Sequence, residues 1–160
     1  MPSSVEMADI AVQTAEVARR LGHEPRVSML SYSNFGNPGW ETADRVREAV
    51  AMMDSRVTDF EYEGEMSADV ALNPELRALY PFSRLSGPAN VLIMPALHSA
   101  NISSKLLQEL GQCTVIGPIL LGFEKPVQIA SLGATVNDIV NLATFAAFDI
   151  DKLGHIKPAE

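Results

Sequence analysis

The chain has 160 residues, of which 47% are hydrophobic and 20% charged, a composition typical of a globular protein large enough to bury a substantial core. Its formal net charge of −8 argues against nucleic acid and anionic membrane surfaces as general partners. The single cysteine, Cys113, excludes an intrachain disulfide, and its apolar surroundings in the sequence predict a buried, inert thiol. The N-terminal segment does not have the pattern of a signal peptide, and no apolar run has membrane-spanning length, so we expect a reducing cytoplasm.

The first third of the chain predicts two amphipathic helices joined by a strand. The first helix is capped by Ser3 or Ser4 and runs to Leu21, with an apolar face made of Val5, Ala8, Val12 and Ala15. A strand follows over 26–30, and a second helix begins near Glu41 and turns Ala43, Val46, Val50 and Met53 toward the core. The loop 31–39 between them is rich in hydroxyls and glycine. It suits a phosphate or acyl group, although Gly and Asn also form plain turns.

Residues 59–63 alternate acidic and aromatic side chains, which predicts a strand with Phe60 and Tyr62 facing inward. The acids within and after this strand, Glu61, Glu63, Glu65 and Asp69, favour a solvated strand face and loop over a metal site, because no histidine lies at ligand spacing. Asn73 followed by Pro74 predicts the start of a short helix, and residues 80–87 are expected to be an exposed connection.

The stretch 87–111 predicts half of a βαβ unit. Residues 90–94 have strand length, Pro95 ends the run, and helical spacing begins at Ile102 after a cap at Ser99 or Asn101. Gly111 suits the end of that helix. The loop between strand and helix contains His98 and lies where open parallel sheets bind ligands, but an ordinary crossover has the same pattern.

The last third predicts two short strands and one long helix. The first strand, 113–121, is broken at Gly117 and Pro118, and the second covers 127–130. Thr135 caps the last helix, whose apolar face consists of Ile139, Leu142, Ala143, Ala146 and Ile150. Residues 139–148 carry no charge, which indicates packing against another domain or subunit.

The predicted fold is therefore an α/β, three-layer αβα domain with an open, mostly parallel sheet built from strands near 27–31, 59–62, 90–94 and 113–116. Nucleotide and zinc motifs are absent from the sequence, and His23, His98 and His155 are dispersed. A constellation of Ser31, His98 and Asp138 can be imagined, but nothing in the spacing supports it. The residues alone predict an acidic α/β domain with one anion-binding edge and no defined reaction.

Five segments, in order, resemble the phosphate acetyl/butyryl-transferase family: SMLSYSNFG (28–36), EGEMSADVAL (63–72), GPANVLIMPALHSANISSKLLQELG (87–111), GPILLGFEKPV (117–127) and GATVNDIVN (133–141). They are most similar to the phosphotransacetylase-like module at the C-terminal end of bacterial NADP-dependent malic enzymes. The resemblance implies two α/β domains around a cleft, with an isocitrate/isopropylmalate dehydrogenase-like fold. It makes 1–128 the second domain, and 129–160 a helix that returns toward a missing first domain, plus a tail.

The resemblance also implies where ligands bind. Transferases of the family carry Ser-Arg-Gly and a following aspartate; here Ser131 and Asp138 match, but Leu132 stands at the arginine position. Asn34 and Phe35 stand where transferases often have Thr-Lys. Two cationic groups are thus missing from an anion-handling site, so we expect no confident catalytic residue. The expected ligand-binding residues are Ser31, Ser33, Asn34, Gly36, His98, Asn101, Lys105, Gly117, Pro118, Lys125 and Ser131, with no metal site.

The resemblance leaves three readings of function. The first is a regulatory and oligomerising module of an NADP-dependent malic enzyme that binds acetyl-CoA or CoA as an effector, while malate decarboxylation, NADP and a divalent metal belong to a missing N-terminal part. The second is a working phosphate acetyltransferase, and the third is a scaffold without a ligand. We expect a homo-oligomer, at least a dimer, from the uncharged face of 139–148 and from Tyr80 and Phe82, and no cofactor, nucleic acid or membrane bound by this chain.

Overall fold

The computed structural model describes residues 1–56, 58–111, 113–121, 123 and 125–152, with the backbone alone over 149–152. The chain divides into two compact units, Met1–Lys105 and Leu106–Glu160. The expected boundary at residue 128 stays a prediction. Among the described residues, no helix has the length and apolar character needed to cross a membrane.

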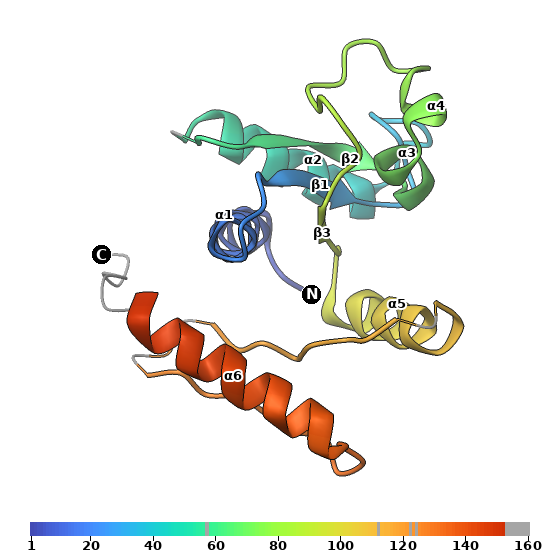
Figure 1. Ribbon diagram of the computed structural model, residues 1–160. Coiled ribbons are helices and arrows are strands. Elements are labelled where there is room, and N and C mark those ends of the chain that lie inside the picture. The colour runs from blue at the N-terminus through green and yellow to red at the C-terminus, as the bar shows by residue number, and fades with distance from the viewer. Residues whose placement is uncertain (57, 112, 122, 124, 153–160) are drawn as a thin grey trace. The chain divides into compact units, whose positions relative to one another are not determined.

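The first unit is built on a parallel sheet of three strands (Figure 1). The middle strand, β1 (Arg26–Leu30), pairs with β2 (Glu61–Met66) on one side and with β3 (Val91–Ile93) on the other. The α/β class and the parallel sheet predicted from the sequence are confirmed. Because the strands are parallel, the loops after β1, β2 and β3 leave from one edge of the sheet, which is the edge expected to bind a ligand.

Two helices, α1 (Ser4–Arg20) and α2 (Glu41–Asp54), cover one face of this sheet. The predicted core residues of α2 are all buried. The predicted face of α1 is partly wrong, because Val5 and Val12 are 48% and 36% exposed. The small side chains of α1 allow its backbone to lie close to the sheet, and so the buried stripe is Ser4, Met7, Ala8, Ala11 and Ala15.

The other face of the sheet carries a smaller layer made by α3 (Ala68–Leu72), α4 (Pro74–Arg77) and the chain that follows. Asn73 caps α4 as predicted, accepting a hydrogen bond from the N–H of Glu75 at 2.9 Å. The expected exposed connection over 80–87 is partly wrong, since Leu85 is only 6% exposed and packs in this second core.

The helix after β3 is α5 (Leu97–Leu110), which starts five residues earlier than predicted. Ser99 lies inside its first turn and donates its hydroxyl to the Ala96 carbonyl at 2.7 Å, so it does not act as the cap. The N–H of Ala100 also donates to the Ala96 carbonyl, which places the helix start immediately after the strand and Pro95. Gly111 ends the helix as expected, with its N–H donated to the carbonyl of Leu107 at 2.8 Å.

The second unit contains the end of α5 and α6 (Val136–Lys152). Thr135 caps α6 as predicted. The strand predicted at 113–116 is wrong: these residues form no ladder, and only an isolated antiparallel bridge joins Ile119 to Gln128. An apolar run makes a strand only beside a neighbour, and without one Cys113 is exposed rather than buried. The tail over 153–160, with His155, and the side chain of Ile150 lie outside the described residues.

Candidate functional site

The loop after β1 folds around the carboxylate of Glu65, which is the penultimate residue of β2. The Glu65 side chain is fully buried, and its Oε1 accepts hydrogen bonds from the Ser33 hydroxyl at 2.5 Å and the Gly36 N–H at 2.7 Å. The guanidinium of Arg47, on α2, lies 3.1 Å from the same oxygen. Two predicted ligand residues, Ser33 and Gly36, are thus brought together by their hydrogen bonds to Glu65. The sequence had led us to expect that Glu65 is solvated.

Most backbone donors of this loop are already used within the protein. The N–H groups of Ser31 and Phe35 donate to the carbonyls of Met66 and Glu65, both at 2.9 Å. The N–H groups of Asn34 and Asn37 donate to each other's carbonyls. An anion bound at this loop would therefore have to be held by other donors, and Ser33, fully buried, offers no exposed hydroxyl in this conformation.

Phe35 joins the loop to the layer beyond β2. Its φ of +51° lies in the left-handed region, which is uncommon for a bulky residue. Its ring packs at 4.8 Å, centroid to centroid, edge-on against Phe82 and at 5.0 Å against Tyr80. Tyr80 is half-buried, while Phe82 is 63% exposed. Phe35, which stands where the sequence resemblance leads us to expect a lysine, is therefore part of an aromatic cluster and not a donor to anions.

Three further candidates lie on α5. His98, Asn101 and Lys105 are spaced three and four residues apart, so they lie on one side of the helix, and all three are exposed. Because β1 and β3 are parallel, the start of α5 and the loop 31–37 leave from the same edge of the sheet.

The candidates of the second unit lie before and at the start of α6. Pro118, Lys125 and Ser131 are exposed, and Gly117 is half-buried. The Asp138 carboxylate accepts from both the N–H and the hydroxyl of Thr135 at 2.8 Å, and these bonds lower the pKa of Asp138 below its ordinary value. Asp138 is thus a capping residue of α6. The Leu132 side chain is fully exposed.

A second buried acid, Glu63, is held by Arg84. Its two oxygens accept from the Arg84 N–H and guanidinium, at 2.8 Å and 3.2 Å. Arg84 also pairs with Asp54 at 2.5 Å and stacks over the Tyr62 ring at 4.6 Å. The expectation that Glu63 and Glu65 are solvated is therefore wrong. The sequence indication for the pairs Glu63–Arg84 and Glu65–Arg47 was the alternation of acids along β2, which in a regular strand puts them on one face, together with arginines in other segments.

The acid limb of the stability curve should depend on Asp54. Its pKa is lowered from the ordinary 3.8 because the Tyr62 hydroxyl donates to it and Arg84 pairs with it. A native pKa below the unfolded one gives stability that is complete above about pH 4 and is lost as the pH falls through the native value. We expect Asp54→Asn to lose less of its unfolding free energy than the wild type between about pH 5 and pH 2 in urea titrations. Parallel curves would contradict this.

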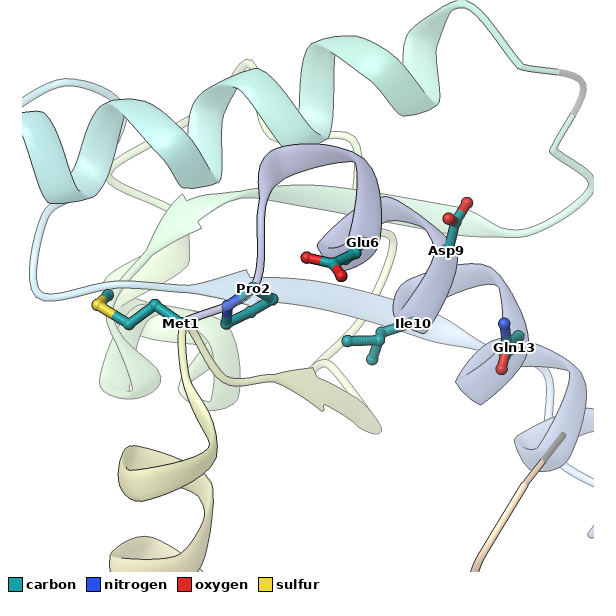
Figure 2. Close-up of a pocket in the computed structure, with 6 residues that line it drawn as sticks. All are labelled: Met1, Pro2, Glu6, Asp9, Ile10 and Gln13. Atoms are coloured by element: carbon teal, nitrogen blue, oxygen red, sulfur yellow. The ribbon is translucent and has the colours of Figure 1, made fainter.

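Figure 2 shows a shallow pocket along the outer side of α1, lined by Met1, Pro2, Glu6, Asp9, Ile10 and Gln13. None of the expected ligand residues lines it. Its two acids are already engaged, Glu6 by Ser3 and Asp9 by Arg56. Within the described ranges, no three His, Cys, Asp or Glu side chains are grouped so that they could hold a metal ion.

Comparison with known proteins places this arrangement in a family. The family model described as phosphate acetyl/butaryl transferase matches residues 1–147. The chain belongs to this family. The resemblance found in the sequence is thereby confirmed.

The relatives are of two kinds. An NADP-dependent malic enzyme of Rhizobium meliloti is 61% identical over 93% of this chain, but the match covers 20% of that enzyme. A phosphate acetyltransferase of Clostridium acetobutylicum is 43% identical over 88% of the chain and is covered over 43% of its length. The crystal structure of a phosphotransacetylase from Streptococcus pyogenes has a TM-score of 0.88 and 39% identity, covering 94% of this chain and 46% of that one. The chain therefore spans a fifth to less than half of these relatives.

Proposed function

We propose that this chain is a regulatory and oligomerising domain that binds acetyl-CoA without transferring its acetyl group. The observation that carries the proposal is the exposed Leu132 at the position where the family resemblance expects an arginine. Arginine supplies a fixed fork of donors for phosphate, and leucine supplies none. Phe35, the second changed position, is part of the aromatic cluster with Tyr80 and Phe82.

Binding requires less than turnover does. A reaction needs donors aligned on the charge that develops in the transition state, whereas a bound anion needs only donors that reach its phosphates. Each unit has suitable donors of its own, the exposed His98 and Asn101 in the first and Lys125 in the second. By its 61% identity to a malic enzyme of which it matches 20%, the chain fits a longer protein in which malate oxidation, NADP and a divalent metal belong to another part.

Isothermal titration with acetyl-CoA tests the proposal. We expect saturable binding to the purified chain, weakened several-fold by added salt and by Lys125→Met, since an exposed cation near a phosphate acts through screened Coulomb attraction. Arg45→Met, on the half-buried side of α2 and outside the expected ligand residues, is the matched control. The absence of binding at about 1 mM acetyl-CoA, an affinity weaker than about −4 kcal/mol, would rule the proposal out.

Self-association is the second part of the proposal. The uncharged helix segment 139–148 leaves Ile139 52%, Val140 55% and Phe148 45% exposed. We expect the chain to sediment as a dimer or larger species at about 10 μM, because such apolar surface is costly to leave in water. Val140→Glu should shift it toward monomer, while Gln13→Glu, at an exposed polar position on α1 in the first unit, should not. A wild-type monomer would contradict the prediction.

A catalytically competent phosphate acetyltransferase is the alternative. It is favoured by the retained Ser131 and Asp138 and by relatives named phosphate acetyltransferases, of which one is 43% identical. Formation of acetyl phosphate by the wild-type chain, from acetyl-CoA and phosphate, would decide in favour of this alternative.

A further inference from the structure

Glu65 uses only one of its two carboxylate oxygens. Oε1 collects the Ser33 hydroxyl, the Gly36 N–H and the Arg47 guanidinium. Oε2 is buried and has no hydrogen-bond partner. Burying a carboxylate is costly unless it is paired, so a fully buried acid that accepts two hydrogen bonds from one loop and a third from Arg47 on α2 indicates a specific role there.

That task is visible in the backbone of the loop. Phe35 has a φ of +51° and Gly36 a φ of +93°, so two consecutive residues are left-handed. The first is strained for a residue with a side chain. The N–H groups of both donate to Glu65, that of Phe35 to its carbonyl and that of Gly36 to its carboxylate. Both left-handed residues of the turn are therefore hydrogen-bonded to Glu65.

We propose that Glu65 is a positioning residue that fixes the loop 33–37 for acetyl-CoA binding, a role that rests on the function proposed above. By holding Ser33 inside the protein, it leaves the half-buried Ser31 as the expected ligand serine of this loop that is not fully buried, while the Asn34 amide oxygen accepts from the N–H and hydroxyl of Ser67. Arg47 balances the charge of the carboxylate beside the site. Ser33 then acts on the ligand only through the shape of the loop.

The chain contains a matched control for this role. Glu63 lies two residues earlier on β2, is also buried, and is also paired with an arginine, but its carboxylate accepts from Arg84 and the Gly64 N–H and not from the loop. Met replaces either glutamate with an apolar side chain of similar length. Glu65→Gln keeps an acceptor oxygen for Ser33 and Gly36 and serves as the conservative variant.

Amide hydrogen exchange measured by NMR provides a readout that does not require a ligand. The N–H groups of Asn34 and Asn37 bond to each other's carbonyls and not to Glu65, so they lose protection only if the whole loop is released. In Glu65→Met we expect their protection to fall about tenfold or more, and the acetyl-CoA affinity to fall by a similar factor. Glu65→Gln should stay within about threefold of wild type, and Glu63→Met should leave both amides protected while releasing the Arg84 amide.

Unchanged protection of Asn34 and Asn37 in folded Glu65→Met would overturn the proposal, and so would an equal loss in Glu63→Met, which would indicate general destabilisation. If Glu65→Met does not fold, Glu65→Asp replaces it, since the shorter side chain withdraws the carboxylate from the loop, and the same readings apply. A wild-type chain that binds no acetyl-CoA would contradict the proposed function and the ligand part of this inference. The amide protection would still decide whether Glu65 positions the loop.

Discussion

Replacing Gly64 with alanine is expected to be among the most destabilising single substitutions in the chain. Gly64 pairs with Met29 in the β1–β2 ladder, has a φ of +155°, and a Cβ built on it would lie 2.7 Å from both the Cβ and the carbonyl oxygen of Met29. Met29 is fully buried in the middle strand, so neither atom can move away. Overpacking and an unfavourable φ together should cost about 3 kcal/mol or more, a large part of the stability of a small domain.

Gly22→Ala is the matched control for this prediction. Gly22 also has a positive φ, +86°, but nothing lies within 4 Å of a Cβ built there. Its substitution should cost only the backbone strain, about 1 kcal/mol. Urea denaturation of the two variants separates the effects, and equal losses would show that crowding against Met29 is not what requires glycine at position 64.

The second large effect concerns activity. We expect no detectable acetyl phosphate from the wild-type chain when acetyl-CoA and phosphate are supplied. The transfer must hold two anionic partners and stabilise charge at the acyl centre, and one lost donor of this kind commonly lowers the rate 10²–10³-fold. Leu132 has no such donor, and Phe35 packs in the aromatic cluster, where it also offers no side-chain donor to an anion.

Leu132→Arg tests the cause of this expected inactivity, and Leu132→Met is the neutral control at the same exposed site. Arginine at 132 should tighten the binding of acetyl phosphate relative to both the wild type and Leu132→Met, because it adds charge-assisted donors. The rate from acetyl-CoA and phosphate is followed by the release of the CoA thiol, and the rate of the reverse reaction by the consumption of that thiol. Clear turnover by the unmodified chain would show that the domain is a working transferase.

What the sequence predicted well is local in origin. The face of α2, the caps Asn73 and Thr135, and the strand-length apolar runs of β1 and β3 depend on neighbouring residues, and the structure has them. The predicted start of α5 was wrong because the Ala96 carbonyl accepts the first hydrogen bonds of the helix, earlier than the apolar spacing indicated. The predicted buried face of α1 was wrong because packing against the sheet selected the stripe with the smaller side chains.

The candidate site was less accessible to sequence reasoning. Glu65 looked like one of several solvated acids, since its partners Arg47 and Ser33 lie 18 and 32 residues away in the sequence. Only the fold shows that the carboxylate and the hydroxyl meet. The prediction of a strand at 113–116 was wrong for a related reason. A strand needs a neighbouring strand to accept and donate its backbone hydrogen bonds, and an apolar run does not reveal whether the fold provides one.

The strand order also determines which part of the sheet can form first while the chain is being synthesised. β1 pairs Val27 with Tyr62 on one side and with Val91 on the other, so its two neighbours leave the ribosome far apart in time. The β1–α2–β2 half can assemble as soon as Met66 is available, but the second edge of β1 stays unpaired until Ile93 follows. An open edge on an apolar strand can pair with another chain. Between the synthesis of β2 and that of β3, the nascent protein therefore has an unpaired edge of β1 at which another chain can bind.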